Sequence, residues 1–364
     1  MKADVAVVGG GVIGLAVAWR AAQRGLSVVL VDDARRARGS WAAAGMLAPV
    51  AEVGHGEERL LALSLRSAQM YPSFVAELES ATGIDAGYRS CGALLVAVDG
   101  DDHAQLLELA AFHERLGLAS RRVDRRGARE LEPALHPSIR SALVIDGDHQ
   151  VDNRRLLRVL HAAAVGVGVR IEIGTASVVA AGRVTGVRVG SGDLVSASKV
   201  VIAAGCWSAS VEGVPIEARP AVRPVKGQIL RLRCDPVRPL LTRTVRAFVH
   251  GSRVYLVPRA DGEVVVGATV EDRGFDATVT AGAVHDILRD ARAVVPEVAE
   301  WELVEAWAGL RPGSPDNAPI IGPTAVDGLI MATGHYRNGV LLAPVTAEAV
   351  AGLLCTGGLD AWAR

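Results

Sequence analysis

Three glycines and an acidic pair near the start of the chain have the spacing of a dinucleotide-binding site. The glycines form Gly9-x-Gly11-x-x-Gly14 between an apolar segment and a helical one, and Asp32-Asp33 closes the next apolar run. Gly9 permits a tight turn, Gly11 lets the backbone approach a pyrophosphate, and Gly14 lets the helix pack closely on the strand. The helix N-terminus attracts the phosphates, and Asp32 can accept hydrogen bonds from ribose hydroxyls. We predict a nucleotide site; a glycine-rich turn with a structural acid is the alternative.

Two further segments are suited to contact a flat ring. Residues 39–49 are mostly small, and residues 334–341 form a glycine-bounded loop before an apolar helix. Rossmann glycines serve NAD, NADP and FAD alike, but the extended FAD needs backbone contacts far from its pyrophosphate. The loop can supply them, because the N-terminus of the following helix can face the electron-rich edge of a flavin. We therefore predict FAD, with an ordinary loop and cap as the alternative. Arg35 and Arg36 could meet the 2′-phosphate of NADP, which Asp32 would repel.

The elements that position these segments follow from hydrophobic periodicity. We expect a helix over 12–24 that Gly25 ends, a helical stretch over 57–82 in which Pro72 marks a kink or join, and a helix capped by Asp152 that reaches residue 165. The other expected elements are helices over 102–116, 281–295 and 340–354, strands over 28–31, 93–98, 142–145, 170–173, 177–181, 184–189, 200–203 and 329–332, a hairpin turn at 190–193, and several antiparallel strands over 222–268.

These elements predict an α/β protein in which a Rossmann-like FAD-binding domain is interleaved with an antiparallel-sheet α+β substrate domain. The expected FAD-binding domain is discontinuous and consists of residues 1–86, 142–221 and 306–364. The expected substrate-binding domain consists of residues 87–141 and 222–305.

Composition excludes some classes of protein. The chain has 364 residues, enough for two domains, and its 39 basic residues nearly balance its 40 acidic ones. Basic residues do not interleave with aromatic ones in any stretch, so we expect no nucleic-acid partner. The four cysteines form no C-x-x-C pair, which indicates neither a zinc site nor a disulfide framework but a reducing compartment. Apolar runs stay below the ~18 residues of a transmembrane helix, so we expect a cytoplasmic protein without a membrane partner.

Several longer motifs resemble those of one enzyme family. They are Gly9 to Gly14 with Asp32, and residues 42–47, 204–208, 224–228, 255–259, 266–269, 307–316 and 334–339. With these motifs the whole chain resembles the glycine oxidase (ThiO) family within the D-amino-acid oxidase superfamily of FAD enzymes. Trp-Ala-Gly-Leu-Arg-Pro at 307–312 and Gly-His-Tyr-Arg-Asn-Gly at 334–339 are fairly specific for it. The family pattern has Met after Gly-Ala-Thr, near the substrate, where this chain has Val270.

The resemblance implies noncovalent FAD, since the covalent flavin cysteine of sarcosine oxidases finds no matching motif. It also implies a homo-oligomer and the oxidation by O2 of glycine, sarcosine, D-alanine or D-proline to an imine or 2-oxo acid and hydrogen peroxide, often feeding thiazole synthesis for thiamin. The residues expected to contact FAD are Gly9, Gly11, Val12, Ile13, Gly14, Asp32, Asp33, Gly39, Ser40, Ala44, Gly45, Met46, Val178, His335, Tyr336, Arg337, Asn338, Gly339, Val340 and Leu341.

Three residues are candidates for binding the substrate. Arg311 lies between an apolar strand and a Pro-Gly turn, and its planar guanidinium can grip a carboxylate in two parallel hydrogen bonds; a structural salt bridge is the alternative. Tyr255 resembles the family's second carboxylate donor, or it is a packing tyrosine. Arg337 matches a family residue near substrate and flavin, although its backbone could matter more than its side chain.

The sequence offers no certain catalytic residue and no metal site. A general base is unnecessary if the substrate binds with a neutral amine, because the nitrogen lone pair then assists departure of a hydride to flavin N5. His335 is expected to contact the flavin edge rather than to act in catalysis. Two other functions stay open. The first is a broader D-amino-acid oxidase, or a dehydrogenase with another electron acceptor, which Val270 suggests. The second is a flavoprotein that serves in binding and does not turn over a substrate.

Overall fold

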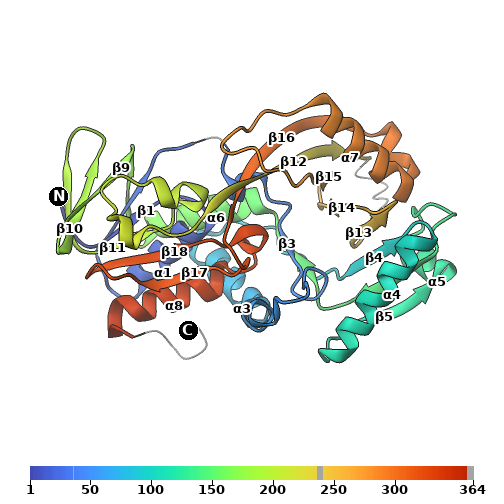
Figure 1. The fold of residues 1–364 in the computed structure, drawn as a ribbon, viewed down its shortest axis with the longest axis horizontal. Helices are drawn as coiled ribbons and strands as arrows, with labels where there is room; N and C mark the ends of the chain where they lie inside the picture. The colour runs from blue at the N-terminus through green and yellow to red at the C-terminus, as the bar shows by residue number, and fades with distance from the viewer. Residues whose placement is uncertain (36, 236–240, 359–364) are drawn as a thin grey trace.

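The computed structural model describes residues 1–35, 37–235 and 241–358, and its architecture rests on two mixed sheets. Figure 1 shows the first sheet with its helices at one end of the long axis and the second sheet with its helices at the other. This confirms the predicted α/β class, with one sheet that has a parallel, Rossmann-like centre and a second sheet that is mainly antiparallel. Arg36, one of the two arginines considered for a 2′-phosphate, lies outside the described residues.

The first sheet has a parallel centre. Its strands β17-β18-β11-β1-β2-β8 lie in that spatial order, β17 is antiparallel to β18, and β9 and β10 attach to β11 as antiparallel strands. Strands β1 and β2 are nearly continuously apolar because both sheet faces are covered. The bounds are β1 Lys2–Val8, β2 Val28–Asp32, β8 Arg170–Ile173, β9 Ala176–Ala181, β10 Arg183–Val189, β11 Leu194–Ile202, β17 Ile320–Pro323 and β18 Leu329–Thr333.

Helices cover one face of the first sheet. They are α1 Val12–Gln23, α3 Glu58–Thr82, α6 Asn153–Gly166 and α8 Ala343–Thr356. Their apolar residues share one core with β1, β2, β11 and β18. Helix α1 ends where Gly25 takes a left-handed φ of 86°, as predicted. The Asp152 side chain accepts hydrogen bonds from the first turn of α6, so the predicted N-cap is confirmed.

The second sheet is antiparallel except at one pair. Its order is β16-β12-β15-β14-β13-β4-β6-β5, and only β13 and β4 run parallel. Helix α7 packs on one face, and α4 packs on the face that looks toward the first sheet. The bounds are β4 Ala93–Ala97, α4 Gly100–Arg115, β5 Arg121–Asp124, α5 Arg125–Leu131, β6 Ser141–Ile145, β12 Arg223–Arg233, β13 Thr244–Val249, β14 Ser252–Pro258, β15 Glu263–Gly267, α7 Ala281–Val294 and β16 Glu302–Gly313.

Short elements join the two sheets. Strands β12 and β16 reach from the second sheet toward the first (Figure 1), and their far ends contact η1. The connecting elements are α2 Gly39–Ala42, the β3–β7 ribbon (Met46–Leu47 with His149–Gln150), and the 3₁₀ helices η1 Gly205–Ser210, η2 Ile216–Ala218, η3 Pro296–Glu300 and η4 Tyr336–Asn338. None of the described helices combines the length and the apolarity needed to cross a bilayer.

Three local expectations differ from the structure. Helix α3 continues past Pro72, so this proline is not a join between two helices, and a kink at this position stays a prediction. Helix α8 begins at Ala343 rather than at residue 340, and Pro344 occupies its first turn, where a missing N–H costs nothing. Arg311 lies inside β16 rather than after a strand; Pro312 is tolerated there because β16 is an edge strand.

The expected domain boundaries at residues 142 and 306 fall inside β6 and β16, two strands of the second sheet. The chain passes between the sheets several times, so apolar pattern alone does not show to which sheet a strand belongs. The division into residue ranges stays a prediction.

Candidate active site

A large cavity of about 790 Å³ lies between the two sheets. The first sheet contributes the turn after β1 and the end of β18, and the second contributes side chains from β13, β14 and β16. The volume is within the range of small-molecule and cofactor sites.

Glycines shape the cavity at the N-terminus of α1. Gly9 has a φ of 109°, and a Cβ there would lie 2.5 Å from the carbonyl oxygen of Ala203. A Cβ on Gly14 would collide with the carbonyl oxygen of Gly9, so the helix packs directly on the turn. The N–H groups of Gly11 and Ile13 have no hydrogen-bond acceptor among the described residues. Unpaired N–H groups at a helix N-terminus form a site for an anion.

Asp32 lies at the end of β2 and also lines this end of the cavity. Its carboxylate accepts hydrogen bonds from the Gly10 N–H at 3.1 Å and from Arg38 Nη2 at 2.7 Å. The neighbouring Asp33 forms an ion pair with Arg35. Since Arg35 is engaged with Asp33, its guanidinium is not held ready for a 2′-phosphate.

A buried arginine positions the segment of small residues. Arg259 Nη2 donates to the carbonyl oxygen of Ala44 at 2.6 Å, and its Nη1 donates to Gln150 Oε1 at 2.7 Å and to the carbonyl oxygen of Val151 at 3.1 Å. Burial lowers the pKa of Arg259 to about 10, so the group stays charged at neutral pH. Gly45 has a φ of 73°, and a side chain there would collide with the Val151 carbonyl. The backbone of residues 44 and 45 is therefore fixed at the cavity wall.

The loop between β18 and α8 forms the opposite wall. The imidazole of His335 is buried, and its Nε2 lies 2.9 Å from Thr346 Oγ1. Burial lowers the pKa of His335 to about 3, so the ring is neutral at any working pH. The N–H groups of Val340 and Leu341 have no acceptor within the part of the chain that is described. They are available to a hydrogen-bond acceptor on a bound ring.

Arg311 and Tyr255 meet on the face of the second sheet that borders the cavity. Arg311 Nη1 donates to the carbonyl oxygens of Thr269 at 3.1 Å and Lys226 at 3.3 Å, and no described carboxylate pairs with this guanidinium. Its planar group lies over Gly227, where a side chain would collide with it. The Tyr255 hydroxyl lies over Gly267; burial raises the phenol pKa to about 12, although Arg311 lowers it in part.

Glu52 holds two arginines at the same end of the cavity. Arg246 pairs with Glu52, and Arg337 Nε lies 2.9 Å from Glu52 Oε2. Arg337 Nη2 also lies 2.6 Å from Glu57 Oε2. Burial alone would raise the pKa of Glu52, but Arg246 and Arg337 outweigh it and hold that pKa below its usual range. The Arg337 side chain is thus engaged by carboxylates of the protein.

The backbone before Glu52 is tied down by a buried acid. Asp148 accepts hydrogen bonds from the N–H groups of Val50 at 3.1 Å and Ala51 at 2.8 Å. Burial raises the pKa of Asp148 to about 7.

Comparisons with known proteins agree with this geometry. The family described as FAD dependent oxidoreductase matches residues 4–353. The chain belongs to this family. It is 36% identical to the glycine oxidase of Pseudomonas putida, and the match covers 97% of this chain and 95% of that one. The crystal structure of glycine oxidase from Geobacillus kaustophilus superimposes with a TM-score of 0.89 at 33% identity and covers 99% of this chain and 96% of that one.

Other relatives are about twice as long. The bifunctional ThiO/ThiG protein of Trichormus variabilis is 34% identical over 96% of this chain, which covers 52% of that protein. This chain therefore spans about half the length of those curated relatives. The comparisons identify an FAD-dependent oxidoreductase that is similar in sequence and structure to glycine oxidases.

The cavity fits FAD. Unpaired N–H groups at Gly11 and Ile13 suit a pyrophosphate, and those at Val340 and Leu341 suit the N1–C2=O edge of the flavin. Cys206 also lines the cavity, but burial raises its pKa to about 12, so its thiol is protonated and a poor nucleophile.

Most of the residues expected at the cofactor line this cavity, and three do not. Gly14 lies behind the turn, where it lets α1 pack on β1. Val178 is buried in β9, where its N–H donates to the Glu212 carbonyl oxygen, and Leu341 is buried below its own loop. Leu341 still offers its N–H group. The roles expected for the remaining residues stay predictions.

Several cavity residues were missed from the sequence. Glu52 carries no spacing signal, because its partners Arg246 and Arg337 lie far along the chain. The same holds for Arg259, which supports the cavity wall without lining the cavity. Arg38 lies only six positions from its partner Asp32, so a local pairing argument could have found it. Arg253 could have been found, because Arg253-x-Tyr255 on a strand places both side chains on one face.

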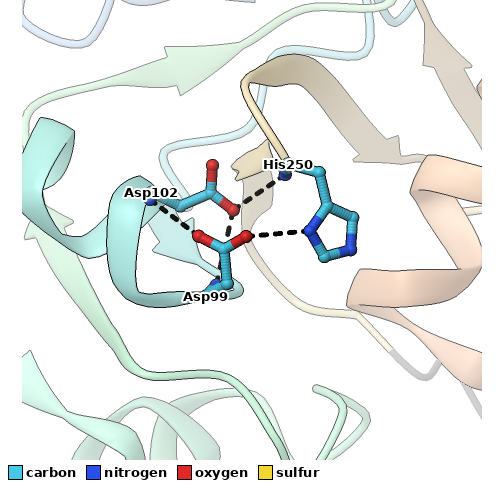
Figure 2. A group of neighbouring side chains, drawn as sticks. All are labelled: Asp99, Asp102 and His250. Atoms are coloured by element: carbon cyan, nitrogen blue, oxygen red, sulfur yellow. Dashed lines mark hydrogen bonds and ion pairs between the residues drawn. The ribbon is translucent and has the colours of Figure 1, made fainter.

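A separate cluster of Asp99, Asp102 and His250 lies outside the cavity (Figure 2). Asp102 accepts hydrogen bonds from the N–H groups of His250 at 2.9 Å and Gly251 at 3.0 Å, and Asp99 accepts from the Asp102 N–H and faces His250 Nδ1. Every carboxylate oxygen thus has a partner within the protein. The cluster caps α4 and anchors the turn between β13 and β14.

Proposed function

We propose that this protein oxidises glycine and other small amines and D-amino acids, such as sarcosine, D-alanine and D-proline, to imines that hydrolyse to 2-oxo acids. The observation that carries the proposal is Arg311. A half-buried guanidinium held by two backbone carbonyls, without a described carboxylate partner, is suited to a carboxylate that arrives with the substrate. The adjacent Tyr255 hydroxyl can add one hydrogen bond to the same carboxylate.

The residues at the site bind the substrate and the cofactor and orient them toward each other. Arg311 and Tyr255, on the second sheet, hold the substrate carboxylate. Residues 44–45 and the loop at 335–341 hold the flavin ring. When bound, FAD accepts a hydride from the substrate Cα at N5 and passes the electrons to O2, which yields hydrogen peroxide. Because His335 is neutral, it places no positive charge beside the substrate. With a pKa of about 3, this imidazole is also too weak a base to take the amine proton, so a substrate that reacts as the neutral amine loses its proton to solvent.

The direct test is peroxide release by the purified holoprotein with glycine, sarcosine, D-alanine and D-proline, and with L-alanine as the control. Activity on the first four and none on L-alanine supports the proposal. Arg311→Ala should weaken carboxylate binding by on the order of 2–4 kcal/mol, because a desolvated charge pair is lost. Arg311→Lys keeps the charge without the planar guanidinium, so its affinity for the carboxylate should lie between those of the wild type and Arg311→Ala. An unchanged apparent affinity for glycine in Arg311→Ala would contradict the assignment.

A second candidate is a broader D-amino-acid oxidase or dehydrogenase. Val270 lines the cavity and is 68% exposed, so its short side chain leaves room here for a substrate side chain. A rate ranking that favours bulkier D-amino acids over glycine would select the oxidase. Anaerobic bleaching of the flavin without peroxide release in air would select the dehydrogenase.

The cellular setting belongs to the same proposal. All four cysteines are free thiols, which supports a reducing compartment such as the cytoplasm. The likeness to ThiO/ThiG proteins supports a role in supplying thiazole for thiamin. We also propose noncovalent FAD and a homo-oligomer; release of flavin on denaturation and light scattering of the holoprotein test these two points.

A further inference from the structure

At the substrate end of the cavity, arginine side chains outnumber the carboxylates that pair with them. Glu52 is shared by Arg246 and Arg337, and Glu57 pairs with Arg337. Arg253 lines the same cavity and forms no ion pair with any described residue. Glu108 of α4 also lines the cavity and, like Arg253, is exposed; the two side chains do not form an ion pair.

Arg253 lies on the same face as the proposed carboxylate site. It is two residues before Tyr255 on β14, so both side chains point from one face of the sheet, roughly 7 Å apart along the strand. Phe248 lies directly opposite Arg253 on β13, and Arg246 lies opposite Tyr255. The Arg253 guanidinium lies over the Phe248 ring, 5.3 Å from its centroid. The ring holds this cation without neutralising it.

The surroundings of Arg253 favour an added anion. Partial burial lowers the pKa of Arg253, and the nearby Arg246 and Arg337 lower it further, while Glu52 opposes them. No described carboxylate forms an ion pair with the Arg253 guanidinium, so this repulsion is not offset by direct contact. An anion placed beside it relieves repulsion from two arginines and gains a charge-assisted hydrogen bond.

We propose that Arg253, held on Phe248, binds a second anionic group of the substrate, so that the site prefers amino acids with a second carboxylate over their neutral analogues. This proposal rests on the proposed amino-acid oxidation, with Arg311 and Tyr255 holding the first carboxylate. A second carboxylate carried a few bonds away, on the nitrogen substituent or on the side chain of a D-amino acid, would extend toward Arg253, which lies roughly 7 Å along β14 from Tyr255.

The test compares substrates that differ only in this charge. The pairs are D-aspartate with D-asparagine, D-glutamate with D-glutamine, and iminodiacetate with its monoamide. For each pair kcat/KM is measured for the wild-type holoenzyme and for Arg253→Gln, and the readout is the ratio of acid to amide within each protein. Effects of the substitution on flavin content or general turnover cancel in this ratio.

We expect the wild-type ratio to exceed 1 for at least one pair and to fall by about 10- to 100-fold in Arg253→Gln, the range for a lost charge-assisted hydrogen bond. Arg253→Lys should retain part of the preference. The matched control is Arg122→Gln, which removes one positive charge from an exposed position on β5 away from the cavity and should leave the ratio unchanged. The pair that responds identifies whether the second carboxylate extends from nitrogen or from Cα.

Two results would overturn the proposal. A wild-type ratio near or below 1 for all pairs, or a ratio that Arg253→Gln does not change, removes Arg253 as an anion site while turnover of glycine leaves the proposed function intact. If neither glycine nor any of the acids reduces the flavin, the proposed function fails, and the substrate preference fails with it.

Discussion

Replacing Gly227 with alanine should disable the carboxylate site without removing any charged group. A Cβ on Gly227 would lie 2.5 Å from Arg311 Cζ and inside contact distance of both terminal nitrogens, whereas ordinary contact begins at 3.4 Å. The two terminal nitrogens would lie 2.3 Å from the Cβ, so the guanidinium must move by about 1.1 Å. Gly227 does not have a positive φ, so alanine fits the backbone and the side chain of Arg311 is what gives way.

The expected loss follows from this displacement. A misplacement of about 1 Å at a positioning group can cost roughly 10²-fold in rate, which corresponds to about 2.7 kcal/mol of transition-state stabilisation. We expect kcat/KM for glycine to fall by about that factor, with flavin content and thermal stability near those of the wild type.

The assay is peroxide release as a function of glycine concentration, together with titration of the flavin absorbance with glycolate, which carries the carboxylate without the amine. Gly282→Ala in α7 is the matched control, because a Cβ there meets no atom within 4 Å. If Gly227→Ala kept the wild-type kcat/KM and glycolate affinity, Arg311 could not be the group that grips the carboxylate.

Three further perturbations test other parts of the site. Gly11→Val should give protein without FAD, since a Cβ there already lies 3.2 Å from Ser40 Oγ and the branches must enter the cavity; a full flavin spectrum in the purified variant would contradict this. Tyr255→Phe should raise KM for glycine by about 3- to 10-fold, the value of one hydrogen bond, and an unchanged KM would leave Tyr255 a packing residue. Asp148 keeps its proton up to about pH 7 when folded but loses it near pH 4 when unfolded, so the contribution of Asp148 to stability should fall as pH rises from 4 to 7; the thermal midpoint of Asp148→Asn relative to that of the wild type should therefore rise over that range, and parallel pH profiles would refute the assignment.

Local signals predicted the Rossmann half of the fold well. The turn at Gly9, the helix stop at Gly25 and the N-cap at Asp152 each depend on one residue and its near neighbours, and the structure confirms all three features. The parallel strands were recognisable because both of their faces are buried and their sequences are continuously apolar.

The second sheet and the charges of the site were harder to predict. Strand β16 mixes apolar and charged residues along an edge, so Arg311 was expected outside a strand. The pairing of Glu52 with Arg246 joins residues 194 positions apart, and no local spacing reports it. Site residues tied by such distant contacts become visible only once the two sheets face each other.

The buried hydrogen bonds of Arg259 have a consequence for protein engineering. This side chain comes from the second sheet, yet its partners, the carbonyl oxygens of Ala44 and Val151 and the amide of Gln150, belong to segments that flank the ring-binding wall. A second sheet transplanted from a homologue without arginine at this position would leave these acceptors unpaired. The substrate sheet and the cofactor wall are therefore a single inherited module, and recombination between relatives should succeed only when its crossover points keep the Arg259 contacts intact.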